Sequence, residues 1–168
     1  MQLKNTYSAR EVASLTGLTA RQLQWWDACR LFASAIAPRR TAAGGFTERR
    51  YTPVDLLELM VLADLRRQGM SIGRIRLLLE TLRDRFGVRL YDAVGGAGPL
   101  TLLTDGRDVY ARTADGEFFN VLKDPAQPLL VLGGDPPLKA LTAKARAHRR
   151  KKRGGRGKDR PAAGSRGV

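Results

Sequence analysis

The chain has 168 residues, of which 43 per cent are hydrophobic, and a formal net charge of +14 at neutral pH. The hydrophobic content suffices for a folded core, while the apolar runs fall far short of the roughly 20 residues that a membrane-spanning helix needs. The first residues lack the apolar stretch of a signal peptide, and the single cysteine, Cys29, excludes an intramolecular disulfide and a multi-cysteine metal site. We therefore expect a cytoplasmic protein with no membrane segment, no metal and no cofactor.

The charge is distributed unevenly along the chain. Residues 1–85 have a net charge of +6 (14 Lys and Arg against 8 Asp and Glu), residues 86–138 of −3 (4 against 7) and residues 139–168 of +11 (12 against 1). A positive excess of this size favours a polyanionic partner, which in a cytoplasmic protein is usually nucleic acid. The three segments are therefore expected to have different roles.

Two capping boxes near the start of the chain predict two short helices. The first, S-x-x-E at residues 8–11, places a helix from Ala9 to just before Gly17. The second, T-x-x-Q at residues 19–22, begins another helix only a few residues later. Two short helices joined by a tight turn that contains glycine form a helix-turn-helix.

The second of these helices is predicted to have a core side and an exposed side. Leu23 and Trp26 are three residues apart and share the core side. Because each residue advances a helix by about 100 degrees, Arg21, Gln22 and Trp25 fall on another side. That side is the candidate recognition surface.

Residues 38–50 are predicted to form a basic hairpin or loop. They show no helical periodicity, and Gly44-Gly45 lies between two Arg-Arg pairs. A simple surface charge cluster is the alternative interpretation, but both pairs flank one glycine turn. The segment is therefore expected to be basic on both arms.

Two further helices are predicted after this hairpin. Thr52 is an N-cap followed by proline, and it begins a helix over residues 53–68 that Gly69 ends. Ser71 caps a fourth helix, which Gly87 closes. The N-terminal half is therefore expected to contain four helices and one hairpin.

Beyond Gly87 the pattern changes to short β-rich runs separated by turn residues. The runs are VRLYDAV, PLTLLTD, DVYART, EFFNVL and PLLVLG, and the separators include Asp105-Gly106, Asp115-Gly116 and Asp124-Pro125. Asp-Gly between such runs is a hairpin signal. We therefore predict a small antiparallel sheet over residues 88–134.

The last part of the chain is predicted to be a basic tail. Pro136-Pro137 breaks the chain, residues 138–148 have the composition of a short helix, and the remainder is too polar and glycine-rich to fold alone. The α+β chain is thus divided into a DNA-binding domain (1–86), a small β-rich domain (87–137) and a mostly disordered basic tail (138–168).

The segment YSAREVASLTGLTARQLQWWD, followed by PRR, ERRYTPVDLLEL and LRRQGMSIGRIRLLL, resembles the DNA-binding domain of MerR-type regulators over about residues 7–82. That family has a helix-turn-helix, a basic wing ending in Arg-x-Tyr-Ser/Thr, and a helix pair with G-x-S/T-x-x-x-I. Residues 49–52 and 69–75 match the two patterns. The resemblance implies a winged helix-turn-helix that binds double-stranded DNA as a homodimer on a pseudo-palindromic site, and that bends or untwists promoter DNA.

The chain departs from this family at two places. Arg30 stands where the family usually has glycine, so the resemblance does not define the end of the second helix. Downstream, many members continue into a long coiled-coil helix that pairs two subunits, whereas this chain turns to β-rich sequence. We therefore expect residues 87–137 to supply the dimer interface, by edge pairing or sheet packing, or to bind a protein partner.

Candidate nucleic-acid contacts follow from side-chain chemistry. In the major groove arginine can form paired bonds with guanine and glutamine with adenine, and an exposed indole N–H can donate to phosphate. Arg10 is either a phosphate contact or simply exposed. The candidate DNA-binding residues are Arg10, Thr19, Arg21, Gln22, Gln24, Trp25, Arg39, Arg40, Arg49, Arg50 and Tyr51. Non-specific contact, with DNA or RNA, is assigned to Arg149, Arg150, Lys151, Lys152 and Arg153.

The sequence contains few of the residue patterns that an enzyme active site needs. His148, the only histidine, lies in a basic run, and Cys29 has the context of a half-buried small residue rather than of a sensor. The Gly-Gly pairs lack the lysine and hydroxyl of a phosphate-binding loop, and most aspartates stand where turns favour aspartate. We therefore expect that the protein is not an enzyme.

Three hypotheses for function remain. The first is a sequence-specific transcriptional regulator of MerR type, located at the bacterial nucleoid. The second is an architectural or recombination accessory protein, either excisionase-like or nucleoid-associated. The third is an antitoxin-like DNA-binding component of a protein complex, since the β-rich runs contain more apolar residues than a lone small sheet can hide.

Overall fold

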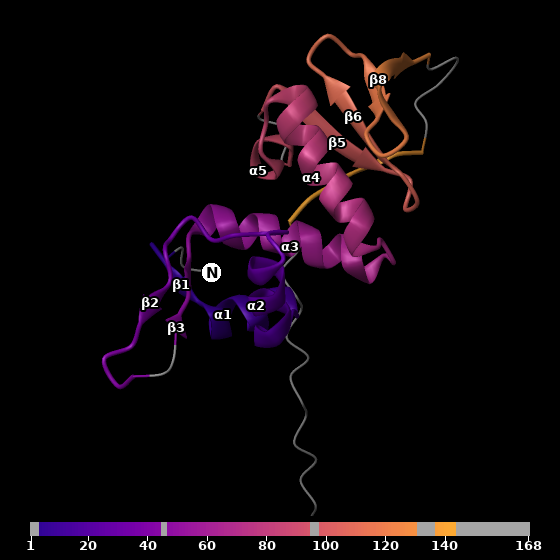
Figure 1. Cartoon of the computed structure of the whole chain (residues 1–168). Coiled ribbons are helices and arrows are strands. Elements are labelled where there is room, and N and C mark those ends of the chain that lie inside the picture. The colour runs from indigo at the N-terminus through magenta and orange to yellow at the C-terminus, as the bar shows by residue number, and fades with distance from the viewer. Residues whose placement is uncertain (1–3, 45–46, 95–97, 131–136, 144–168) are drawn as a thin grey trace, which may run out of the picture.

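The computed structural model describes residues 4–44, 47–94, 98–130 and 137–143. A helix-turn-helix and a hairpin lie at one end of the molecule, and an antiparallel sheet lies at the other (Figure 1). The two long helices α3 (Pro53–Arg67) and α4 (Ile72–Phe86) connect them. The predicted mixture of an N-terminal helical region and a C-terminal antiparallel sheet is therefore confirmed. None of the helices in the described ranges is both long and apolar enough to cross a membrane.

The helix-turn-helix consists of α1 (Ala9–Thr16) and α2 (Ala20–Ala28), at the predicted positions. Both capping boxes are present. The side chains of the two N-cap residues, Ser8 and Thr19, accept hydrogen bonds from the backbone N–H groups three residues later, and the Glu and Gln side chains there bond back to the N-cap. Each box satisfies two of the donors that a helix N-terminus leaves unpaired, which explains why both helices begin where they do.

The end of α2 is formed by a left-handed residue that is not glycine. The helix closes at Cys29, and Arg30 follows with φ +53°. The backbone N–H of Leu31 donates to the carbonyl of Trp26 at 2.9 Å, as in the turn that commonly ends a helix. Glycine is favoured at this position because it has no Cβ to clash. Arg30 therefore ends the helix at a conformational cost.

Two short strand pairs border the helices. β1 (Tyr7–Ser8) pairs antiparallel with β4 (Arg50–Tyr51) and ties the start of the described chain to the residues before α3. β2 (Arg39–Arg40) pairs antiparallel with β3 (Thr47–Glu48) and forms a hairpin that projects from the molecule (Figure 1). The predicted basic hairpin is thus present, with residues 45–46 of its tip outside the described ranges.

The long helices form the core of the N-terminal half. Thr52 caps α3 and Ser71 caps α4 as predicted, and Gly87 ends α4 in the left-handed conformation. Each fully buried aliphatic side chain contributes about 1.5–3 kcal/mol of transfer free energy. The fully buried leucines and isoleucine of the two helices are Leu56, Leu59, Leu62, Leu65, Ile75, Leu78 and Leu82.

The C-terminal strands form one antiparallel sheet in the order β8-β7-β6-β5-β9. One of its faces packs on the helices: the ring of Phe119 meets that of Phe86 of α4 edge to face, with 5.7 Å between the centroids. The predicted turns at residues 105–106 and 115–116 join the first three strands. The strands are β5 (Leu100–Thr104), β6 (Val109–Thr113), β7 (Phe118–Asn120), β8 (Asp124–Leu129) and β9 (Lys139–Ala140).

The β-rich prediction is wrong at two places within the sheet region. Residues 90–93 form the short helix α5 (Leu90–Ala93) instead of a strand, because Leu90 and Ala93 are buried together on one side. Asp124 and Pro125 begin β8 instead of forming a turn. The turn lies at residues 121–123, where the side-chain oxygen of Asn120 accepts two backbone N–H groups.

The predicted helix over residues 138–148 is also wrong where the structure describes it. Lys139 and Ala140 form β9, which pairs with β5, and the N–H of Leu141 donates to the carbonyl of Leu102 at 2.9 Å. Pairing with an existing strand edge outweighs the helix propensity of this short segment. The sheet therefore extends past the predicted boundary at residue 137. Residues 144–168, which include His148 and most of the basic tail, lie outside the described ranges.

Candidate nucleic-acid interface

The outward side of α2 has the residues predicted for a recognition surface. Leu23 and Trp26 are buried, whereas 51 per cent of Trp25 is exposed. The side-chain oxygen of Gln22 accepts the backbone N–H of Thr19 at 2.8 Å, which leaves the NH₂ group of this amide as its outward donor. The helix therefore displays an indole and several polar groups on one side. The exposed residues of this side are Thr19, Arg21, Gln22, Gln24 and Trp25.

An ion pair joins α2 to the hairpin. Nε of Arg49 lies 3.0 Å from Oδ2 of Asp27, and both side chains are about three-quarters covered. Tyr51 is only 2 per cent exposed, and burial raises the pKa of its hydroxyl. Of the predicted contact residues, Arg49 is thus held in an ion pair with α2 and Tyr51 is buried. The ion pair fixes the hairpin relative to α2.

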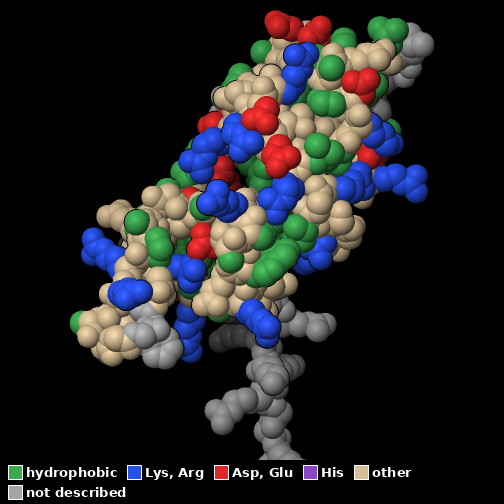
Figure 2. All heavy atoms as spheres, in the orientation of Figure 1, with side chains coloured by type: hydrophobic (Ala, Val, Ile, Leu, Met, Phe, Trp, Pro, Cys, Tyr) green, Lys and Arg blue, Asp and Glu red, His purple; other side chains and the backbone are tan. Residues whose placement is uncertain are grey.

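The remaining cations of the hairpin are exposed. Arg39 and Arg40 lie on β2, and Arg50 of β4 pairs with Glu48 at 2.6 Å in a solvent-exposed ion pair. Such pairs contribute at most about 1 kcal/mol, so a phosphate can replace the carboxylate of Glu48. Arg10 is exposed on α1. Figure 2 shows Lys and Arg side chains over the whole visible face, including the hairpin and the helical end, while Asp and Glu lie mostly toward the sheet.

Two arginines of the long helices hold the helix-turn-helix in place. The guanidinium of Arg67 donates to the carbonyl of Thr16, at the end of α1, at 2.8 Å. The guanidinium of Arg76 donates to the carbonyl of Cys29, at the end of α2, at 3.1 Å. No local sequence pattern shows that these two side chains reach partners 51 and 47 residues away along the chain.

A buried carboxylate joins α4 to the sheet. Asp108 accepts a bond from Arg74 at 2.7 Å and one from Lys123 at 2.6 Å, and it is almost inaccessible to solvent. A buried carboxylate of this kind is costly without partners, and Arg74 and Lys123 supply them. The sheet is thereby attached directly to the N-terminal turn of α4.

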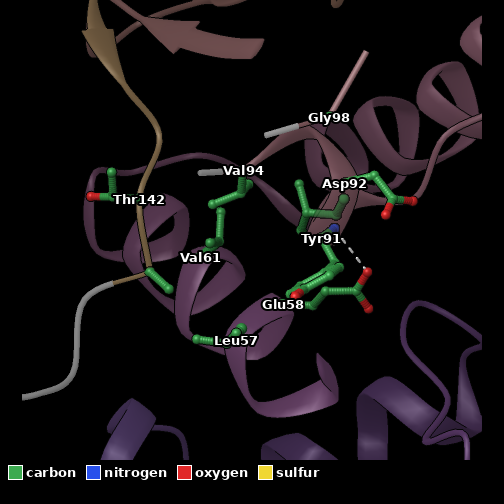
Figure 3. Close-up of a pocket in the computed structure, with 10 residues that line it drawn as sticks. Leu57, Glu58, Val61, Tyr91, Asp92, Val94, Gly98 and Thr142 are labelled. Atoms are coloured by element: carbon green, nitrogen blue, oxygen red, sulfur yellow. Dashed lines mark hydrogen bonds between the residues drawn. The ribbon is translucent and has the colours of Figure 1, made fainter. Parts of the chain in front are cut away.

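A cavity of about 440 Å³ lies beside α3 and α5, away from α2. Its wall is mostly apolar, and Glu58 and Asp92 are the charged residues that line it (Figure 3). Glu58 is engaged there, because it accepts the backbone N–H of Tyr91 at 3.0 Å and pairs with Arg89 at 2.8 Å. The described residues of its lining include two carboxylates and no cation, a lining that does not favour a phosphate.

The described ranges contain no cluster of three or more His, Cys, Asp or Glu side chains that could hold a metal ion. Cys29 is half-buried, and its thiol lies 3.5 Å from the carbonyl of Trp26. The predicted non-specific contacts at residues 149–153 lie outside the described ranges.

Comparison with known proteins identifies one matching family model and three related regulators. Residues 7–82 match the family model described as MerR HTH family regulatory protein. The chain is also similar to uncharacterized HTH-type transcriptional regulators of Mycobacterium tuberculosis and Mycobacterium bovis. Each is 31 per cent identical over 117 residues, which make up 70 per cent of this chain and 48 per cent of the relative. The chain therefore spans about half the length of the curated relatives that it matches.

Proposed function

Residues 7–82 belong to the MerR family of helix-turn-helix domains, and from this premise we propose that the protein is a sequence-specific DNA-binding transcriptional regulator. The observation that carries the proposal is the outward side of α2. There Arg21, Gln22 and Trp25 are exposed while the buried side anchors the helix. The major groove of B-form DNA, about 12 Å wide, admits a helix with such a surface.

Each exposed residue has a role in this proposal. Arg21, in the first turn of α2, reads a guanine edge, and the free amide donors of Gln22 and Gln24 reach base edges or phosphates. The indole N–H of Trp25 donates to a phosphate oxygen. The exposed cations outside α2 neutralise the flanking backbone, and they are Arg10, Arg39, Arg40 and Arg50.

Arg49 and Tyr51 take a supporting role in the proposal. Asp27 already neutralises Arg49, and Tyr51 is buried beside it, so neither presents a free group to DNA. A hairpin that was not fixed to α2 would lose orientation entropy on binding, and a preorganised one avoids that cost. The pair therefore aids affinity without reading sequence.

Two copies of the chain act together in the proposed function. One small module binds DNA weakly, whereas two linked modules on a pseudo-palindromic site gain affinity through their high effective concentration. Bending or untwisting of promoter DNA between the half-sites would follow from their spacing. The basic residues 149–153 would add affinity that does not depend on sequence.

Selection of binding sites from random duplexes, followed by titration of the selected site, tests the proposal. Replacing Arg21 with alanine should cost on the order of 1–3 kcal/mol and relax specificity at one base pair. Arg83→Ala, which removes an exposed cation at the far end of α4, is the matched control and should leave the preference unchanged. If Arg21→Ala binds the selected site as tightly as the parent, α2 is not the recognition helix. Broad genomic coverage without sharp sites would favour an architectural protein.

A further inference from the structure

The two faces of the C-terminal sheet differ in how far other parts of the protein bury them. The inner face packs toward α4 and α5, and its side chains, which include Leu102, Val109, Ala111 and Phe119, are buried. The register places Thr101, Arg112, Phe118 and Leu129 side by side on the opposite face, with Leu103 and Tyr110 in the adjacent row. Here Arg112 is exposed, Tyr110 and Phe118 are half-buried, Leu103 is buried, and 43 per cent of Leu129 is accessible. This outer face therefore carries partly exposed apolar and aromatic side chains beside an exposed arginine.

We propose that this outer face is the surface on which a second copy of the chain packs. The biological use of such a dimer, on two DNA half-sites, rests on the proposed function, but the contact itself does not. The outer face is defined as Thr101, Leu103, Tyr110, Arg112, Phe118 and Leu129.

Edge-to-edge pairing of β8 is the less favourable way to join two copies. β8 is the edge strand of the sheet, but Pro125 and Pro128 have no backbone N–H to offer. The N–H of Ala126 already donates to Oδ1 of Asp124 at 3.2 Å. Three of the six residues of β8 therefore lack a free donor, which is how natural sheets block the addition of a strand. The other edge strand, β9, has only two residues, so packing of the two faces is the more favourable arrangement.

The charges on the outer face complement those of a second copy. Arg112 lies toward one end of β6, while Asp105 lies at the turn beyond the other end and accepts a hydrogen bond from the Tyr110 hydroxyl at 3.1 Å. Consider a two-fold axis that lies in the plane between the two faces and runs perpendicular to the strands. This axis reverses the strand direction of one copy relative to the other. It thereby places Arg112 of each copy over the ring of Tyr110 and the carboxylate of Asp105 in the other copy. Such a contact is self-complementary.

The size of the face indicates a weak dimer. A strand of five residues is about 17 Å long, and four neighbouring strands span about 19 Å, so the plan area is roughly 320 Å². A stable interface of standard size buries about 800 Å² on each partner. A face this small suits two copies that DNA already holds close together, since a high effective concentration compensates for weak contact.

The experiment measures self-association of the full chain without DNA, by sedimentation at about 1–100 μM, the range of weak association. Leu129→Asp should raise the dissociation constant at least about tenfold, because it buries an unpaired charge. Leu77→Asp on α4 is the matched control, since Leu77 and Leu129 are 42 and 43 per cent exposed. Arg112→Glu should also weaken the dimer by like-charge repulsion, while Arg112→Lys should retain it. Thermal unfolding verifies that each variant is folded.

The outcomes separate this inference from the proposed function. If the folded Leu129→Asp and Arg112→Glu variants lose the dimer while Leu77→Asp keeps it, the result supports dimerisation through the outer face. The inference is overturned if the parent chain stays monomeric at about 100 μM, the upper end of the range for weak association. It is also overturned if only Leu77→Asp disrupts the dimer, or if the dimer survives both variants of the outer face. If the parent dimerises through this face but binds no DNA sequence selectively, the inference stands and the proposed function fails.

Discussion

Arg76 of α4 donates its guanidinium to the carbonyl of Cys29, the C-cap of α2, at 3.1 Å. The last carbonyls of a helix have no partner within the helix, and they carry the negative end of its dipole. A cation placed there stabilises the end of α2 and ties it to the long helices. Arg67 makes the corresponding contact with α1. The helix-turn-helix is therefore held by side chains from the helix pair as well as by its apolar core.

Arg76→Ala is expected to lower the free energy of unfolding by about 1–2 kcal/mol, because a charge-assisted hydrogen bond to a partly buried carbonyl is lost. Urea unfolding of the full chain measures the change. Arg83→Ala removes the same charge from the same helix, but Arg83 pairs only with its neighbour Asp84 among the described residues, so little change is expected there. Equal midpoints for the two variants would show that the contact with Cys29 contributes nothing.

Arg30→Gly is expected to stabilise the protein by about 0.5–1 kcal/mol. Arg30 has φ +53°, where a side chain costs energy and glycine does not. The gain is partly offset because glycine adds entropy to the unfolded chain. Arg10→Gly provides the contrast: Arg10 lies within α1, so glycine there should destabilise by about 1 kcal/mol. Thermal unfolding that shows both variants destabilised would contradict the strain assigned to Arg30.

Asp27→Asn and Arg49→Ala are expected to weaken binding of the selected DNA site by similar factors, on the order of tenfold (1.4 kcal/mol). Both remove the ion pair that positions the hairpin. The double variant should be no weaker than either single one, because coupled residues are not additive. A direct phosphate contact by Arg49 predicts a different result. Arg49→Ala alone would then reduce the salt slope by about 1.

Removal of the basic tail is expected to reduce salt dependence without changing base preference. The chain should end at Ala143, because β9 and the buried Leu141 belong to the sheet. Each phosphate that the tail neutralises contributes about 0.9 to the slope of log affinity against log salt on duplex DNA, and the slope should become shallower by several units. Equal slopes would show that the tail does not contact DNA. The same titration with single-stranded RNA separates the two nucleic acids.

Local sequence determined where the helices of the N-terminal half begin and end. The capping boxes at Ser8 and Thr19, the Thr52-Pro53 start and the Gly87 stop act over three or four residues, so they can be read without the fold. The two sides of α2 follow from the helical period, which assigned Trp26 to the core and Trp25 to the surface. The Asp-Gly turns predicted the hairpins of the sheet for the same reason.

Tertiary structure decided what depends on distant partners. Short segments have weak intrinsic preferences for helix or strand. Packing against α3 therefore decided that residues 90–93 form a helix, and the free edge of β5 decided that residues 139–140 form a strand. The roles of Arg49 and Arg76 depend on Asp27 and Cys29, which lie 22 and 47 residues away. A guanidinium has the same local sequence signal whether it binds phosphate or caps a helix. Only the folded chain brings it to its partner.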